Sequence, residues 1–158
     1  MYRQQLQFLQ QWLKNKNRKP LIIRGARQVG KSTLVELFSQ QESMSLLNIN
    51  LERYPDLAST FASNDPQQIL TTLEMLPKIP KSDETSILFL DEIQAVPSAI
   101  PALRYFYEDK PSLPVIGAGS LLEFTLSDHN FSMPVGRIQY LHMGPMTFTE
   151  FLLAIKEE

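Results

Sequence analysis

The chain has 158 residues, of which 43% are apolar and 20% are charged, a composition typical of one folded globular domain. It has no cysteine, which excludes disulfide bonds, thiolate metal sites and cysteine nucleophiles, and its two histidines, His129 and His142, are too few to form a zinc site by themselves. No run approaches the ~18 apolar residues of a membrane span and the first residues lack the apolar core of a signal peptide, so we expect a cytoplasmic protein without a membrane partner.

The charge is unevenly distributed along the chain. The formal net charge is only −2, yet residues 1–31 hold eight of the fifteen Lys and Arg residues and no acidic residue. The eight are Arg3, Lys14, Lys16, Arg18, Lys19, Arg24, Arg27 and Lys31. This concentration predicts an anionic partner near the N-terminal third, either nucleic acid or the phosphates of a nucleotide. Alternatively, the four cations within 14–19 form a solvated helix end, where positive charge suits the helix dipole.

The first half of the chain predicts a helix, a strand, a glycine-bounded loop and a second helix. Apolar residues recur at helical spacing over residues 3–15, which predicts an amphipathic N-terminal helix. The apolar run 21–23 ends at Gly25, and a helical pattern resumes at 34–38. Residues 46–51 alternate in part between apolar and polar and predict another strand. This order is the start of an α/β unit.

Helices and strands continue to alternate in the second half. Asp65 followed by Pro66 is a helix cap and a first-turn proline, which predicts a helix through about residue 76. Thr147-x-x-Glu150 is a capping box that predicts a last helix. The other predictions are a loop at 77–85, strands at 87–90, 115–116 and 138–143, a helix at 99–108, and one or two helical turns at 120–127. Strands separated by helices predict a three-layer αβα sandwich with a mostly parallel sheet.

Residues 25–32 carry the most specific motif in the chain. Their sequence, GARQVGKS, satisfies G-x-x-x-x-G-K-[ST] and lies between a predicted strand and a predicted helix. Glycines at 25 and 30 let backbone N–H groups curl around an anion, and the following helix directs its positive end at the phosphates. Lys31 is expected to bridge the β- and γ-phosphates, and Ser32 to ligate Mg²⁺. The alternative is an ordinary glycine-bounded turn with a solvated lysine.

A phosphate-binding loop also accounts for much of the basic charge. Arg24 and Arg27, with Arg18 at the margin, lie in or beside it in the sequence. The expected nucleotide contacts are Gly25, Ala26, Arg27, Gln28, Val29, Gly30, Lys31, Ser32 and Thr33.

Two acidic residues follow the most apolar strand of the chain. Residues 87–90 (ILFL) are typical of a strand covered on both faces, and Asp91 and Glu92 come at its carboxyl end, where open α/β sheets bind ligands. We expect Asp91 to be the second ligand on the metal side. Glu92 is expected to hold and polarise the attacking water, which favours hydrolysis over transfer to a second substrate. The alternative is a plain pair of carboxylates at a strand end.

Two further polar residues are candidates for the site. Ser120 follows the strand at 115–116, where it is either a sensor of the nucleotide state or the N-cap of the helical turns at 121–127. Arg137 is the only basic residue between Lys110 and Lys156. It is either a surface residue or a guanidinium that stabilises charge at a γ-phosphate, in the same chain or from a neighbouring subunit.

Taken together, these residues resemble the AAA-type P-loop ATPases, and more narrowly a prokaryotic family of predicted ATPases. The matching segments are LIIRGARQVGKSTLVELF, ILFLDEIQ, VIGAGSLL and PVGRIQYLHMGPMTFTEFL. The resemblance implies a five-stranded sheet of order 5-1-4-3-2, with the strand at 115–116 between the phosphate-loop strand and the strand that ends at Asp91. The functional residues that it implies are Lys31, Ser32, Asp91 and Glu92 in the roles above, Ser120 at the sensor position, and Arg137 as a further catalytic residue.

Relatives of this kind continue well past the segment equivalent to 148–151. We therefore expect an N-terminal amphipathic helix at 1–20 and a truncated ATPase core at 21–158, with DNA-binding or protein-binding regions missing beyond it. The predicted function is Mg²⁺-dependent ATP binding and hydrolysis, in a module that could form a homo-oligomer. The alternative is a nucleotide-gated binding module for DNA or protein with negligible turnover. No N-K-x-D motif occurs, which disfavours guanine recognition.

Overall fold

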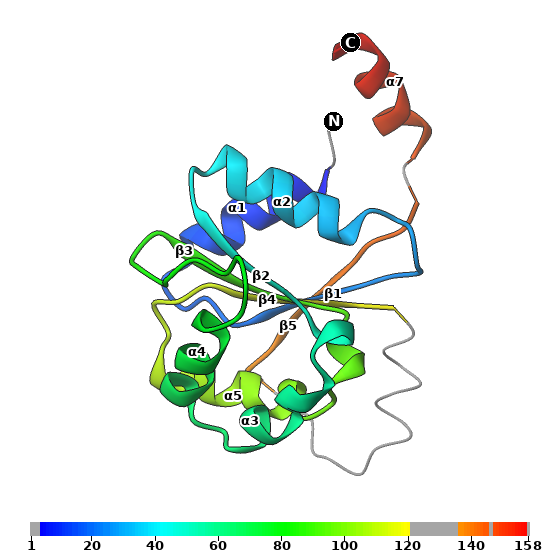
Figure 1. Ribbon diagram of the computed structural model, residues 1–158. Helices are drawn as coiled ribbons and strands as arrows, with labels where there is room; N and C mark the ends of the chain where they lie inside the picture. The colour runs from blue at the N-terminus through cyan, green and yellow to red at the C-terminus, as the bar shows by residue number, and fades with distance from the viewer. Residues whose placement is uncertain (1–3, 121–135, 146, 158) are drawn as a thin grey trace.

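The computed structural model describes residues 4–120, 136–145 and 147–157, which form a three-layer αβα sandwich (Figure 1). Five parallel strands make the central sheet, in the order β2-β3-β4-β1-β5. The strands are β1 (Leu21–Arg24), β2 (Ser45–Asn50), β3 (Ser86–Asp91), β4 (Val115–Gly119) and β5 (Gln139–His142). Read from the other edge, this is the expected order 5-1-4-3-2, so the predicted fold class is confirmed.

Helices cover both faces of the sheet (Figure 1). One face is covered by α1 (Gln5–Lys14) and α2 (Lys31–Gln41), and the other by α3 (Ala58–Ala62), α4 (Pro66–Glu74) and α5 (Ala99–Asp109). These helices agree with the predictions except for α3, which was not expected. Three short 3₁₀ turns, η1 (Leu51–Arg53), η2 (Pro55–Leu57) and η3 (Ile93–Ala95), were not expected either, because each is too short to show a helical period. Of the turns expected at 120–127, residues 121–127 lie outside the described residues.

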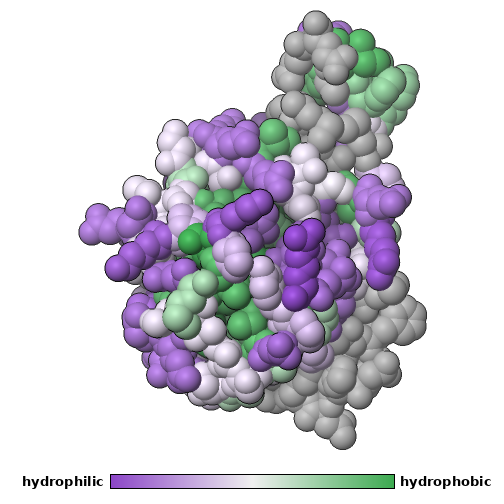
Figure 2. Space-filling model, in the orientation of Figure 1, coloured by the Kyte–Doolittle hydropathy of each residue, from purple (hydrophilic) through white to green (hydrophobic). Residues whose placement is uncertain are grey.

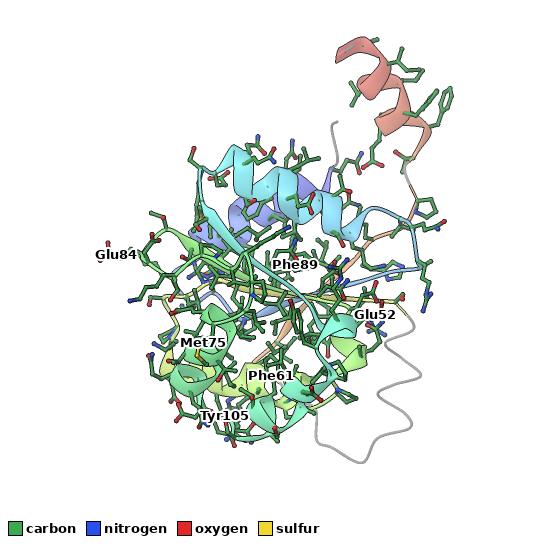
Figure 3. The ribbon with its side chains drawn as sticks, in the orientation of Figure 1. Glu52, Phe61, Met75, Glu84, Phe89 and Tyr105 are labelled. Carbon is green, nitrogen blue, oxygen red and sulfur yellow. The ribbon has the colours of Figure 1, made fainter. Side chains whose placement is uncertain are left out.

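Strand side chains alternate between the two layers of helices, because successive residues of a strand point to opposite faces. Ile87 and Phe89 pack on the side of α1 and α2, whereas Leu88 and Leu90 pack on the side of α3, α4 and α5. Figure 3 shows Phe89 and Phe61 on opposite sides of the sheet. Both faces are therefore filled by side chains, which leaves the ends of the strands as the place where a ligand can reach the sheet.

The last helix, α7 (Phe148–Glu157), begins with the predicted capping box. Thr147 N donates to Glu150 Oε2 at 2.8 Å, and Glu150 N donates to Thr147 Oγ1 at 3.2 Å. The other carboxylate oxygen accepts from Gln4 N at 3.1 Å, which ties the start of α7 to the N-terminal segment. The helix projects away from the layers and exposes apolar side chains, including Phe148 and Phe151 (Figures 1 and 2).

Candidate functional site

The residues that follow β1 form a tight loop that leads into α2. Gly25 lies so close to the carbonyl oxygen of Met143 that a Cβ would overlap it. Gln28 and Gly30 have φ of 64° and 93°, a left-handed conformation that curls the chain back on itself. Gly30 is the N-cap of α2, whose eleven residues place the positive end of a helix dipole in the loop. A curled backbone and a helix start are the two features of an anion site.

Lys31 is buried and folds back over the loop. Its Nζ donates to the carbonyl oxygen of Gly25 at 3.0 Å and to that of Ala26 at 2.6 Å. Burial lowers the pKa of Lys31, and the negative charges of Glu92 and Asp91 act in the opposite direction. The predicted phosphate-binding lysine is therefore held between the loop and the two acids, rather than extended into solvent.

Ser32 and Asp91 join α2 to the end of β3. Ser32 Oγ donates to Asp91 Oδ2 at 2.6 Å, and Glu92 N donates to Asp91 Oδ1 at 2.9 Å. Burial raises the pKa of Asp91, opposed by these two hydrogen bonds and reinforced by the charge of Glu92. The two residues predicted to be on the metal side, 59 positions apart in the sequence, are thus in direct contact.

Glu92 follows Asp91 in an unusual backbone conformation. Its φ of 52° is left-handed, which is uncommon for a residue with a Cβ, and it precedes the 3₁₀ turn η3. Gln94, within that turn, donates from Nε2 to Glu92 Oε2 at 2.6 Å. Gln94 could not be predicted from the sequence pattern, because its contact with Glu92 depends on the turn.

A cavity of about 390 Å³ brings these elements together. Its lining residues are Arg27, Gln28, Gly30, Lys31, Ser32, Thr33, Glu52 and Glu92. The volume lies within the range of small-molecule sites. Glu52 is an addition to the predicted set, and it lies at the carboxyl ends of the strands (Figure 3). The signal that could have found it is its place just after β2, whose last residue, Asn50, is in register with Asp91.

Ser120 directly follows β4, the strand between β1 and β3. This places it between the loop after β1 and Asp91 at the end of β3. It is buried, and its Oγ has no hydrogen-bond partner in the part of the chain that the structure describes. Its position therefore suits a sensor, while its alternative role as an N-cap concerns residues outside the described ranges.

Arg137 lies at the end of the sheet opposite to the phosphate loop. It precedes β5, whose first residue pairs with Leu21 at the start of β1, whereas the phosphate loop follows the end of β1. Its Nε forms an ion pair with Glu108 Oε1 at 2.9 Å. The structure therefore does not bring Arg137 to the loop of its own chain, and a catalytic role for it would require a neighbouring subunit.

Arg18 is also distant from the loop, which corrects its expected place at the loop margin. Its guanidinium donates to the carbonyl oxygens of Leu13 at 2.7 Å and Ser112 at 3.0 Å, on the side where β1 and β4 begin. It also lies over the ring of Trp12. Burial lowers the pKa of Arg18. Its contacts with Leu13, Ser112 and Trp12 make it a structural residue rather than part of a solvated helix end.

The remaining predicted residues lie in or beside the loop. Val29 is half-buried and packs against the core cluster on the side of α1 and α2. The guanidinium carbon of Arg24 lies 5.3 Å from the centre of the Tyr140 ring, on β5. Arg24 therefore lies directly before the loop, as expected, with its charge over an aromatic face.

The residues of the site fit a magnesium nucleotide. Among the described residues there is no group of three His, Cys, Asp or Glu side chains that could hold a metal ion by themselves. Ser32 and Asp91 offer two adjoining hard oxygen atoms, and Mg²⁺ is commonly bound by one or two such groups together with the phosphates of a substrate. A cation at this place would thus depend on the phosphates that the loop is shaped to hold.

The described helices include none that is long and apolar enough to cross a membrane. No curated protein matches the chain. A family model described as "AAA domain" matches residues 17–152, an interval that includes the loop after β1, the two acids after β3 and Ser120. The match covers most of the sequence and includes the residues that line the cavity. The chain therefore belongs to the AAA domain family, the P-loop nucleotide-binding proteins that its sequence motifs indicated.

Proposed function

We propose that this AAA domain binds ATP together with Mg²⁺ and hydrolyses the bond to the γ-phosphate. The observation that carries the proposal is the 2.6 Å hydrogen bond between Ser32 Oγ and Asp91 Oδ2, which joins the phosphate loop to the end of β3 beside Glu92. It supports a site in which the phosphate loop, Ser32 and Glu92 line one cavity, and Asp91 lies directly behind Ser32 as a second oxygen ligand for a cation.

Each residue has a separate task in this proposal. Lys31 exchanges its hydrogen bonds to the loop carbonyls for phosphate oxygens. Ser32 and Asp91 hold Mg²⁺, which when bound offsets the negative charge of the phosphates. Glu92 orients the attacking water and accepts its proton, as the water oxygen bonds to the γ-phosphorus and the bond to the ADP oxygen breaks. The products are ADP and inorganic phosphate.

Radiolabelled ATP tests the proposal when binding and single-turnover hydrolysis are followed together, with Mg²⁺ or with EDTA. Lys31→Ala should weaken binding, because it removes the lysine that lines the cavity beside the loop. Glu92→Gln should keep binding but slow hydrolysis about 10²-fold or more, the usual contribution of a general base. EDTA should abolish turnover of the wild type.

A matched control separates the loss of Glu92 from the loss of any carboxylate. Glu36 is an exposed residue of α2, so Glu36→Gln should leave both binding and turnover unchanged. Equal turnover in the wild type and in Glu92→Gln would refute the catalytic assignment of Glu92. Turnover that persists in EDTA would refute the requirement for Mg²⁺.

A second proposal is that the same site acts as a nucleotide-gated switch with negligible turnover. Met143 favours it, because this buried residue contacts the loop at Gly25 and lies five positions before the first residue of α7. The exposed apolar residues of α7 would then contact a partner only in one nucleotide state. ATP that binds without forming ADP, together with a change in hydrogen exchange in α7, would favour this proposal over hydrolysis.

The proposed partners follow from charge and from the position of Arg137. Lys14 and Lys16 are exposed, so DNA binding, if it occurs here, should weaken about 10-fold or more between 50 and 200 mM salt. If no DNA binding is found at low salt, the basic residues of the N-terminal third serve phosphate recognition alone.

We also propose a homo-oligomer. In it, Arg137 of one subunit would reach the nucleotide bound to another subunit. We propose a cytoplasmic location, because the chain has no cysteine.

A further inference from the structure

Glu92 is held by a second side chain of its own turn. Gln94 Nε2 donates to Glu92 Oε2 at 2.6 Å, a short bond for a neutral amide and a carboxylate. The bond occupies one oxygen of the carboxylate and leaves the other able to accept a proton. Because an ionised carboxylate has no hydrogen to donate, the amide must present its N–H to Glu92 and direct Oε1 elsewhere.

The other end of the amide fits against β4. Gln94 Oε1 is buried and has no hydrogen-bond partner among the described residues. It lies 2.5 Å from the place that a Cβ on Gly119 would occupy, so the amide has room only because residue 119 is a glycine. Gly119 precedes Ser120 and lies in the strand next to β3. Gln94 therefore lies between the end of β4 and the carboxylate of Glu92.

The backbone of the turn fixes both partners. Asp91 Oδ1 accepts from Glu92 N at 2.9 Å, and Ala95 N donates to the carbonyl oxygen of Glu92 at 3.0 Å. Glu92 itself is left-handed, a conformation that costs energy for a residue with a Cβ and that the surrounding contacts must maintain. A strained backbone and a short side-chain bond both restrict where the carboxylate of Glu92 can lie.

We propose that Gln94 is a positioning residue that aims the carboxylate of Glu92 into the nucleotide cavity, with Gly119 providing the space for its amide. The inference rests on the proposed hydrolytic function. Gln94 does not contact the reacting atoms; it acts through Glu92. Its loss should therefore lower the rate of the chemical step and leave the affinity for ATP intact.

Steady-state hydrolysis by three single variants tests the inference. Gln94→Met keeps the length of the side chain but has no N–H to donate, so kcat should fall about 10-fold or more while KM changes less than about twofold. Gly119→Ala should lower kcat in the same way, because its Cβ displaces the amide of Gln94 without altering either partner. Gly144→Ala is the matched control and should be unchanged, since its Cβ would meet no atom of the described residues within 4 Å.

A double-mutant cycle distinguishes a positioning role from a structural one. In a Glu92→Gln background, Gln94→Met should cause almost no further loss in single-turnover rate, because the carboxylate that it positions is already absent. Melting temperature and ATP binding identify a variant that fails to fold. If Gly119→Ala fails to fold, the result for Gln94→Met decides whether Gln94 positions Glu92.

The outcomes separate this inference from the proposed function. Unchanged kcat in Gln94→Met, or a full additional loss in the Glu92→Gln background, overturns the inference while hydrolysis by the wild type stands. Absence of turnover in the wild type overturns the proposed function, and with it the inference. Turnover that Glu92→Gln does not affect refutes the assignment of Glu92, and therefore also the role of Gln94.

Discussion

Asp91→Asn should stabilise the nucleotide-free domain and at the same time weaken its response to Mg²⁺-ATP. Asparagine has the same shape as aspartate and can keep both hydrogen bonds of Asp91. Its Oδ1 can accept from Glu92 N, and its Nδ2 can donate to Ser32 Oγ once that hydroxyl turns to accept. The substitution therefore removes a charge while keeping both contacts, and the hydroxyl hydrogen of Ser32, which is only half-buried, turns toward solvent in the cavity.

The size of the gain follows from the surroundings of the carboxylate. Burial is the main cause of the raised pKa of Asp91, and the nearby charge of Glu92 adds to it, so the charged form is disfavoured in the folded state. Because the side chain is only half-buried, solvent reduces the effect, and we expect a gain of about 1 kcal/mol, within the range common for stabilising substitutions. For a domain of this size that is about 2–4 °C in melting temperature.

The gain should depend on pH in a direction that the structure fixes. Between the ordinary pKa of 3.8 and the raised pKa of Asp91, the folded protein binds more protons than the unfolded chain. The free energy of unfolding of the wild type therefore falls as the pH rises through this window and carries the full penalty above it. The advantage of Asp91→Asn should be largest near neutral pH and should shrink as the pH falls toward about 4.

Thermal unfolding of both proteins, at two pH values and with or without Mg²⁺-ATP, measures these effects. At about 100 times its dissociation constant, the ligand should add about 2.7 kcal/mol to the wild type and clearly less to Asp91→Asn. Asp65→Asn is the control, because Asp65 is an exposed N-cap of α4 and asparagine caps a helix equally well. A wild type more stable than Asp91→Asn at neutral pH, or a difference independent of pH, would refute the reasoning.

Three further predictions concern the core, the N-terminal helix and the distant arginine. Phe89→Ala should cost about 3–5 kcal/mol in urea unfolding, because the ring is fully buried, and Phe89→Leu should cost much less. Trp12→Phe should cost about 1 kcal/mol by loss of the 2.7 Å bond to the carbonyl oxygen of Lys19, and an unchanged unfolding midpoint would contradict this. If the domain acts as a monomer, Arg137→Ala should leave hydrolysis unchanged, because Arg137 pairs with Glu108 away from the loop. If subunits associate, Arg137→Ala should slow hydrolysis and mixing it with Lys31→Ala protein should restore activity, and no recovery would exclude a role between subunits.

The sequence predicted the parts of the fold that depend on local pattern. Apolar runs identified the buried strands, and Asp65 and the Thr147–Glu150 box identified helix starts, because each of these is decided within a few residues. The secondary structure of residues 51–62 was not predicted. It forms two 3₁₀ turns and the five-residue α3, whose shape is set by burial of Leu57 and Phe61 rather than by a periodic pattern.

The site shows the same division between local and tertiary information. The loop at 25–32 and the acids at 91–92 were predictable because their motifs lie on single turns that follow strands. Glu52 and Gln94 were not, because their relation to the site arises from strand register and from a 3₁₀ turn. Arg137 precedes a strand parallel to β1, so it lies at the other end of the sheet from the phosphate loop. The residue type alone could not show this, because the position depends on the direction of β5 in the sheet.

Lys31 and Asp91 form a site in which charge is buried before any ligand arrives. Burial lowers the pKa of the amine and raises that of the carboxyl, so each charge is disfavoured by the same desolvation. Hydrogen bonds to neutral groups partly offset this desolvation. Lys31 donates to two carbonyl oxygens, and Asp91 accepts from a hydroxyl and a backbone amide. Phosphate oxygens and a divalent cation would replace these partners with charged ones, and charge-assisted bonds are about twice as strong as neutral ones. The arrangement that reduces stability without nucleotide is thus the one that would increase the gain when nucleotide binds.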